Sequence, residues 1–365
     1  MVFIYTITDY LTYYKDIKIK DVHWNTVDQL ICAMLTYLPI TPYQGVKTFA
    51  EFFSYAEGYK DVPKESFMVP MAYEILDFMK DAKRYEALKI SNFENFRSNE
   101  TQFGAATFRL GTQTTIAFKG TDYSLIGWIE NFRLAYEYPT RTHKLAIEYL
   151  EANLKLLGDR NVSIVGHSKG GNLAMVVAME ASPRTFSRIK KVYNFDGPGF
   201  RKEEFAKPEY QKLTAKLINI IPSGSVVGSL LYNDNYTVIK SEGISVTEHF
   251  PTSWNLFGEC FIEATQTSVS ARVHESTTKG IAHLDYNKVE EALETVFQSF
   301  EVDYTSNITM SFDELIKFLK NLKNIDPEVR KCIIEILEAL LTAKPDGESF
   351  SIRKIIKNKI TNKTE

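Results

Sequence analysis

The sequence has few of the residues that cross-link a chain or bind metals. It holds three cysteines in 365 residues, Cys32, Cys260 and Cys332, and only six histidines. An odd number of widely separated cysteines indicates neither a disulfide framework nor a metal site. Cys32 stands in an apolar run and is interpreted as a small core residue rather than a nucleophile. We therefore expect no disulfide, no metal and no cofactor.

Long apolar runs and an excess of one charge are also missing. No stretch approaches the length of a membrane span. The first ten residues, MVFIYTITDY, have neither the basic region nor the long apolar core of a signal peptide. The net charge of −3 gives no reason to expect nucleic-acid binding. We expect a cytoplasmic protein without a transmembrane segment, and leave open its oligomeric state and any transient contact with a membrane surface.

The composition is otherwise that of an ordinary globular protein. Apolar residues make up 44% and charged residues 24%, with 24 Phe and 20 Tyr. The chain is long enough for one large domain with additions, or for two domains. The aromatic side chains fill a core or line an apolar cleft, and composition alone does not separate these two interpretations.

One stretch, NVSIVGHSKGGNLAMVVA at residues 161–178, carries a chemical pattern. It predicts a buried strand at 162–165, a tight turn around Ser168, and a helix from about Gly171. Gly-x-Ser-x-Gly between an apolar strand and a helix is the nucleophile-elbow pattern of α/β-hydrolases. The turn must be sharp and strained to raise the serine hydroxyl above the sheet, and Gly166 and Gly170 remove side chains that would collide there.

The rest of the chain predicts strands separated by helices. Helices are expected at 21–38, 43–58, 70–89, 141–157, 287–300, 311–322 and 327–343; a hairpin at 106–110 and 114–118; and further strands at 191–195, 216–221 and 236–241. This order predicts the α/β class, with a mostly parallel central sheet flanked by helices. We divide the chain into a helical N-terminal segment packed on the core (1–90), the α/β-hydrolase core (91–285) and a C-terminal helical extension (286–365).

A serine hydroxyl needs a base within hydrogen-bonding reach, and in this fold the base follows the nucleophile in the chain. His249, His274 and His283 follow Ser168. We favour His249, because it comes just after the last clear strand, at the sheet edge where catalytic groups gather. His167 is expected to pack beside the elbow, because its side chain points away from the neighbouring hydroxyl.

The acid that orients the base has several candidates. Asp196 ends the strand after the elbow helix, in NFDGPGF, where a carboxylate is well placed to orient an imidazole. Its alternative interpretation is a turn-capping aspartate. Asp234 lies in a predicted turn, and Glu248 adjoins His249 and is not expected to face it. We favour Asp196 and keep Asp234 as the alternative.

Negative charge that develops on the substrate oxygen requires hydrogen-bond donors. The backbone N–H after the nucleophile, that of Lys169, is one expected donor. The loop Gly120–Asp122 directly follows an apolar strand upstream of the elbow. Thr121 is the expected second donor through its amide, and its hydroxyl is an additional candidate donor. The plain alternative for Lys-Gly-Thr-Asp is a loop without a role.

These residues also carry a resemblance. AFKGTD, followed by Trp128 and Phe132 and then by VGHSKGG, resembles the lipase class 3 branch of the α/β-hydrolases. More closely, the chain resembles the Mbeg1-like family of that superfamily, formerly a domain of unknown function. The matching blocks cover roughly residues 20–260: HWNTVDQLICAMLTYLP, FKGTDYSLIGWIENF, IVGHSKGGNLA, VYNFDGPGF, IIPSGSVVG and HFPTSW.

The resemblance implies an α/β-hydrolase fold and ester hydrolysis, without fixing a substrate. Lipase class 3 members carry the acid in the block that matches IIPSGSVVG, where this chain has Ser223 and Ser225. Some lipases carry it one strand earlier, where Asp196 falls. The expected function is a lipase-like or esterase-like serine hydrolase acting on a small-molecule ester or lipid-like substrate. The alternatives are an acyltransferase or thioesterase with the same triad, and a non-catalytic binding protein on a hydrolase scaffold.

Overall fold

The computed structural model describes residues 5–62, 66–122, 124–154, 161–281 and 286–298, together with Thr305, Pro327 and 329–331. Its helices are α1 Ile7–Tyr14, α2 Thr26–Leu35, α3 Phe49–Glu57, α4 Met68–Met79, α5 Leu125–Arg133, α6 Arg141–Asn153, α7 Lys169–Met179, α8 Pro183–Arg188, α9 Lys202–Phe205, α10 Pro208–Thr214, η1 Ser245–His249, η2 Pro251–Ser253, α11 Ser268–Ile281 and α12 Tyr286–Gln298. Its strands are β1 Tyr43–Thr48, β2 Lys89–Arg97, β3 Gln102–Leu110, β4 Gln113–Phe118, β5 Asn161–His167, β6 Ile189–Phe195, β7 Leu217–Pro222, β8 Tyr236–Ile239, β9 Leu256–Phe257 and β10 Cys260–Phe261.

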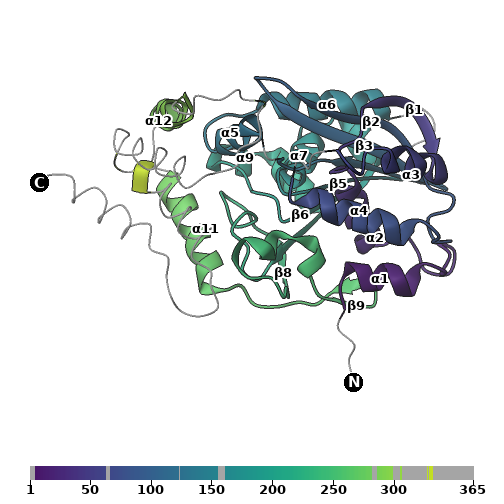
Figure 1. Cartoon of the computed structure of the whole chain (residues 1–365). Coiled ribbons are helices and arrows are strands. Elements are labelled where there is room, and N and C mark those ends of the chain that lie inside the picture. The colour runs from purple at the N-terminus through teal and green to yellow at the C-terminus, as the bar shows by residue number, and fades with distance from the viewer. Residues whose placement is uncertain are drawn as a thin grey trace, which may run out of the picture.

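Eight strands, β1 to β8, form one sheet in chain order (Figure 1). The pairs from β1 to β4 are antiparallel, and those from β4 to β8 are parallel. The predicted α/β class with a mixed, mostly parallel sheet is confirmed. The parallel half brings the carboxyl ends of β4 to β8 to one edge, and the segments that follow β4, β5, β6 and β8 carry the predicted site residues.

Two apolar cores lie on the two faces of this sheet, because neighbouring residues of a strand point to opposite sides. Ala117 and Val165 belong to the core shared with α1 to α4. Ile116 and Ile164, one position earlier on the same strands, belong to the core shared with α6 and α7. The near-continuous apolar pattern of the central strands follows from burial on both faces.

The first segment is mostly helical, and it also contributes to the sheet. The predicted helix at 21–38 is present as α2, where the side chain of Asn25 accepts the N–H of Val27 at 2.9 Å and caps the helix. The single helix predicted at 43–58 is wrong in its first half. Residues 43–48 form β1, and α3 begins only at Phe49. Val46 of β1 is 58% exposed, so this edge strand lacks the apolar alternation that predicts a strand.

The C-terminal part is described in less detail. The helix predicted at 287–300 is present as α12, and a helix not predicted, α11, precedes it. The helix predicted at 311–322 lies outside the described residues, as does most of the one predicted at 327–343, of which Pro327 and 329–331 are helical. The division at residues 90 and 285 stays a prediction, although β1 ties the first segment to the sheet.

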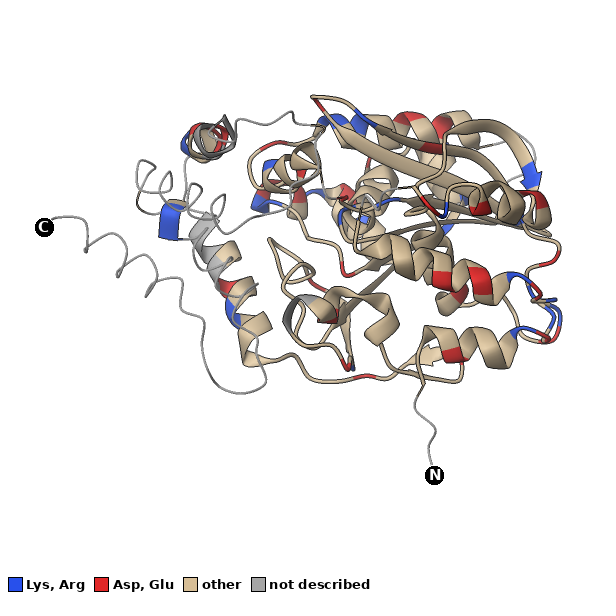
Figure 2. Ribbon diagram, in the orientation of Figure 1, with Lys and Arg blue, Asp and Glu red and all other residues tan. Residues whose placement is uncertain are grey.

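Charged residues of both signs are interspersed over the helices and loops, as Figure 2 shows. This pattern fits the small net charge of −3. In the described part of the chain, no helix is both long and apolar enough to span a membrane.

Candidate active site

Ser168 stands alone between β5 and α7, at the sharp turn that the sequence predicts. Its backbone has φ 59° and ψ −135°, a strained conformation for a residue with a side chain. The turn is tight enough to need glycine, since a Cβ on Gly166 would lie 2.0 Å from the carbonyl oxygen of Gly170. Ser168 is 8% exposed, so its hydroxyl lies in a nearly enclosed position.

Asp196 and His249 meet beside this turn. Asp196 follows β6, the strand next to β5, and its Oδ2 lies 2.6 Å from Nδ1 of His249. The carboxylate is fully buried, and its Oδ1 accepts the hydroxyl of Ser225 and the N–H of Gly228, the latter at 3.1 Å. With Nδ1 engaged by Asp196, Nε2 is the nitrogen of His249 that remains available for proton transfer.

Ser225 and Gly228 hold the carboxylate of Asp196, and neither is among the residues predicted from the sequence. Both belong to the block IIPSGSVVG, in which lipase class 3 members carry their acid. In this chain the block supplies hydrogen-bond donors to Asp196 instead of a carboxylate of its own. The serine at position 225, in place of a carboxylate, was the sequence feature that could have indicated this role.

His167 lies between Ser168, its neighbour in the chain, and His249, whose ring is 4.4 Å from its own between centroids. Both nitrogens of the His167 ring have hydrogen-bond partners. Its Nε2 donates to the backbone carbonyl of His249 at 2.9 Å, which leaves Nδ1 to accept the hydroxyl of Tyr37 at 3.0 Å. Burial and the neighbouring His249 hold the pKa of His167 well below its usual range. A neutral His167 with both nitrogens engaged supports the loop of His249, in agreement with the packing role expected for it.

The other candidate acids have different partners. Asp234 accepts the hydroxyl of Tyr210 at 2.6 Å. Glu248 accepts the backbone N–H of Gly224 at 2.9 Å, and burial raises the pKa of its carboxyl. Of the three candidate carboxylates, only Asp196 makes a hydrogen bond to the His249 ring within the described residues.

The remaining histidines lie elsewhere or are not described. Nδ1 of His274, in α11, lies 3.3 Å from the carbonyl oxygen of Ser229. His283 lies outside the described residues. His143 is buried, and its Nε2 donates to Oδ1 of Asn172 at 2.8 Å. Burial lowers the pKa of His143 to about 4, so this side chain is neutral near pH 7.

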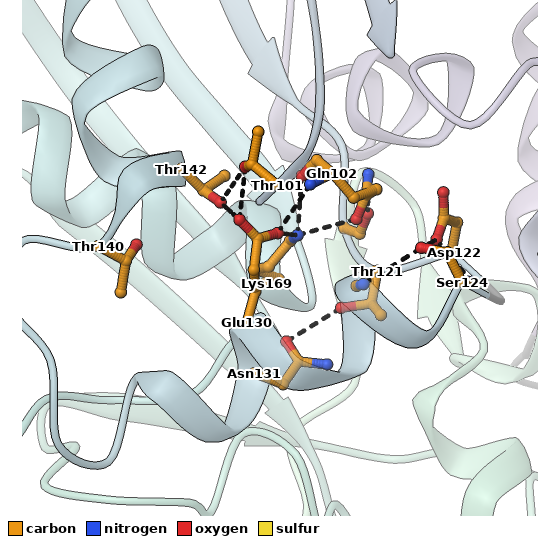
Figure 3. A network of polar contacts seen from close by, with 12 residues as sticks. Thr101, Gln102, Thr121, Asp122, Ser124, Glu130, Asn131, Thr140, Thr142 and Lys169 are labelled. Atoms are coloured by element: carbon orange, nitrogen blue, oxygen red, sulfur yellow. Dashed lines mark hydrogen bonds and ion pairs between the residues drawn. The ribbon is translucent and has the colours of Figure 1, made fainter. Parts of the chain in front are cut away.

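The loop Gly120–Asp122 touches the elbow from the end of β4. A Cβ on Gly120 would lie 2.7 Å from the carbonyl oxygen of His167 and 3.0 Å from Cβ of Ser168. The hydroxyl of Thr121 donates to Oδ1 of Asn131 in α5 at 3.0 Å (Figure 3). Within the described part of the chain, the backbone N–H groups of Thr121 and Lys169 donate to no backbone carbonyl.

Asp122 anchors the far end of this loop. Its carboxylate lies 2.6 Å from Nε of Arg97 and accepts the backbone N–H of Ser124 at 2.9 Å. Burial opposes ionisation of Asp122, but the charges of Lys119 and Arg97 outweigh it and lower the pKa of the carboxyl. The loop that carries Thr121 is thereby fixed at both sides.

The residues brought together are chemically suited to acyl transfer. They are a strained serine, a histidine held by a buried carboxylate, and backbone amides at the elbow. Among the described residues, no group of three or more His, Cys, Asp or Glu side chains is arranged to hold a metal ion.

The sheet order, its parallel half and the strand–turn–helix around Ser168 define the α/β-hydrolase fold. Residues 79–298 match the model of the Mbeg1-like family, and the chain belongs to that family.

Two solved lipase structures are similar to it. One is M37 lipase, 17% identical, with a TM-score of 0.36, covering 55% of this chain and 67% of that one. The other is a deletion mutant of Rhizomucor miehei lipase in its propeptide complex, 14% identical, with a TM-score of 0.36, covering 76% of this chain and 78% of that one. No curated protein matches the sequence.

Proposed function

We propose that this protein is a serine hydrolase that cleaves carboxylic esters, with Ser168, His249 and Asp196 as its catalytic triad. The observation that carries the proposal is the contact of 2.6 Å between Asp196 and His249, next to a serine in a strained elbow. A carboxylate at Nδ1 holds the imidazole in the tautomer whose Nε2 accepts a proton, and it stabilises the imidazolium that forms.

In the first half of the reaction, Oγ of Ser168 bonds to the carbonyl carbon while its proton passes to Nε2 of His249. The electron pair of the C=O π bond moves to the oxygen, which accepts hydrogen bonds from the N–H groups of Lys169 and Thr121. Re-formation of the carbonyl then breaks the bond to the alcohol oxygen, which takes the proton from His249.

In the second half, a water molecule repeats these steps on the acyl-enzyme. It gives its proton to His249, releases the carboxylic acid and restores Ser168. The resemblance of the family to class 3 lipases favours an ester with an apolar acyl chain.

The test is hydrolysis of p-nitrophenyl esters of graded acyl length by the full chain and by Ser168→Ala. We expect hydrolysis by the wild type, and a loss of at least about a thousandfold in the variant, because the other groups cannot replace the nucleophile. Equal activity of the two proteins would refute the proposal. A thioester of the same chain length and an added acceptor alcohol, tested in parallel, separate ester hydrolysis from thioesterase and acyltransferase activity.

A further inference from the structure

Lys169 has two parts with different surroundings. Its backbone N–H follows the nucleophile and is a proposed oxyanion donor, whereas its side chain runs inward and is 1% exposed. The ammonium lies 2.6 Å from Oε2 of Glu130, 2.8 Å from Oε1 of Gln102 and 3.0 Å from the carbonyl oxygen of Gln102 (Figure 3). Its three N–H groups therefore have three acceptors.

Glu130 is as completely enclosed as its partner. It belongs to α5, is 2% exposed, and its Oε1 accepts the hydroxyls of Thr101 and Thr142. Its Oε2 also accepts the backbone N–H of Gln102 at 3.2 Å. A buried charge pair loses its hydration, and apolar side chains of similar size often stabilise such a site equally well. The pair next to the nucleophile is therefore better explained by what it holds in position than by stability.

The side chain of Gln102 carries the network to the second proposed oxyanion donor. Its Oε1 accepts from Lys169, and its Nε2 donates to the carbonyl oxygen of Gly120 at 3.3 Å. That carbonyl and the N–H of Thr121 belong to one peptide unit, which is planar and trans, so they point in opposite directions. A hydrogen bond that fixes the Gly120 oxygen therefore also fixes the direction of the Thr121 N–H.

Helix α5, which carries Glu130, also holds the side chain of Thr121. Asn131 follows Glu130 in α5 and accepts the Thr121 hydroxyl at 3.0 Å. The amide of Thr121 is thus oriented through Gln102 and its side chain through Asn131. Both contacts depend on α5, because Glu130 accepts the backbone N–H of Gln102 and Asn131 accepts from Thr121. The Glu130–Lys169 pair attaches α5 to the elbow.

We propose that Glu130, Gln102 and the side chain of Lys169 form a positioning network that sets the direction of both oxyanion donors, the N–H groups of Lys169 and Thr121. The inference rests on the proposed ester hydrolysis and names the residues that prepare its oxyanion site. These three side chains are positioning residues, because they act through backbone amides and not on the substrate.

The first test replaces Gln102 by Met, which has a similar size and cannot donate to Gly120. The readouts are kcat and KM for a p-nitrophenyl ester, and the Ki of an alkyl trifluoromethyl ketone, whose adduct with serine carries the same oxyanion as the intermediate. We expect kcat to fall about 10- to 100-fold and Ki to rise by a similar factor, with little change in KM, because misdirected donors weaken transition-state binding.

A second variant covers the case in which Gln102→Met does not fold. Lys169→Met combined with Glu130→Gln removes both charges and keeps the Lys169 N–H. Its matched control is Arg84→Met combined with Asp28→Asn, the same change at a buried pair in the N-terminal helices. We expect kcat to fall and Ki to rise about tenfold in the first double variant, with neither changed in the control.

The inference is overturned if Gln102→Met, or the double variant where Gln102→Met does not fold, keeps the wild-type kcat and Ki. It is equally overturned if the loss appears in KM alone, or if the control double variant loses as much. An inactive wild type, indistinguishable from Ser168→Ala, refutes the proposed function and this inference together. An active wild type with unchanged network variants refutes only the inference.

Discussion

Two ion pairs in this protein are equally buried and equally short, but they lie in different regions. Arg84 and Asp28 meet at 2.6 Å among the N-terminal helices, with both side chains fully buried. Lys169 and Glu130 meet at 2.6 Å beside the elbow, with side chains 1% and 2% exposed. Burial and distance alone therefore do not distinguish them.

The difference lies in what each pair contacts next. Arg84 donates to the backbone carbonyls of Val22 and His23, and Asp28 accepts the hydroxyl of Tyr85 at 2.8 Å. These contacts join the segment before α2, α2 itself and the chain after α4, and they serve the fold. The network of Lys169 ends instead at Gly120, whose peptide unit carries a proposed oxyanion donor. The groups at the end of a buried network therefore indicate its role better than the charge pair itself does.

The largest expected effect belongs to the elbow region. Asp196→Asn places an amide against Nδ1 of His249 and favours the wrong tautomer, so we expect kcat to fall roughly ten-thousandfold. Steady-state kinetics on a p-nitrophenyl ester measure the change. Asp234→Asn is the matched control, because the carboxylate of Asp234 accepts from Tyr210. If Asp234→Asn lost as much activity as Asp196→Asn, the assignment of the acid would be wrong.

The second effect belongs to the N-terminal helices and concerns stability. Arg84→Met leaves the buried carboxylate of Asp28 without its counter-ion, and we expect the free energy of unfolding to drop by about 3–5 kcal/mol. Urea denaturation measures the loss. The kcat of the protein that remains folded should stay at the wild-type value. A drop in kcat that exceeds the loss of folded protein would contradict the separation of the two regions.

Tyr37 connects the two regions and tests how separate they are. It follows α2, and its hydroxyl donates to the buried Nδ1 of His167, whose ring holds the loop of His249. Tyr37→Phe leaves that nitrogen without a partner, so we expect a loss of about 1–3 kcal/mol in the free energy of unfolding. Kinetics should show a decrease in kcat with little change in KM. An unchanged kcat together with a lower stability would contradict a role of Tyr37 in positioning His249.

The smallest expected effect is a pH dependence confined to the elbow side. The folded state holds the pKa of His143 at about 4, below its usual value near 6.5, so the unfolded chain binds a proton first as the pH falls. Stability should therefore decrease below about pH 6.5, and His143 should contribute up to about 2 kcal/mol of the loss by pH 5.

Urea denaturation at pH 7 and pH 5 checks this prediction. His143→Gln, which does not titrate in this range, should reduce the difference between the two pH values. An unchanged difference would mean that other groups cause the acid sensitivity, with His167, whose pKa is also depressed, as the first to examine.

The parts of the fold that the sequence predicts well are those with a local pattern. The elbow, the hairpin of β3 and β4 and the parallel strands carry apolar runs or short turns that can be read directly. β1 and β2 were missed because β1 is an exposed edge strand, and a bulge between Ser91 and Glu94 interrupts the pairing of β2. Their pairing depends on partners far along the chain, which a local pattern does not contain.

The site divides in the same way. Chain order and strand ends lead to Ser168, Asp196, His249 and Thr121 as candidates. The partners that hold them, such as Ser225 for Asp196 and Gln102 for Gly120, depend on the folding of loops and on burial. From the sequence, a lysine after the nucleophile is expected to be a solvent-exposed charge. Only the structure shows that the Lys169 side chain is buried and paired with Glu130.

The central claim is that Ser168 is a nucleophile activated by His249 and Asp196, and covalent labelling tests it most directly. The full chain is treated with a fluorophosphonate, the modified residue is identified by mass spectrometry, and the labelling rate is compared with those of Asp196→Asn and Asp234→Asn. We expect a single adduct on Ser168, formed at the wild-type rate in Asp234→Asn and far more slowly in Asp196→Asn. Absence of an adduct on Ser168, or equal rates in all three proteins, would contradict it.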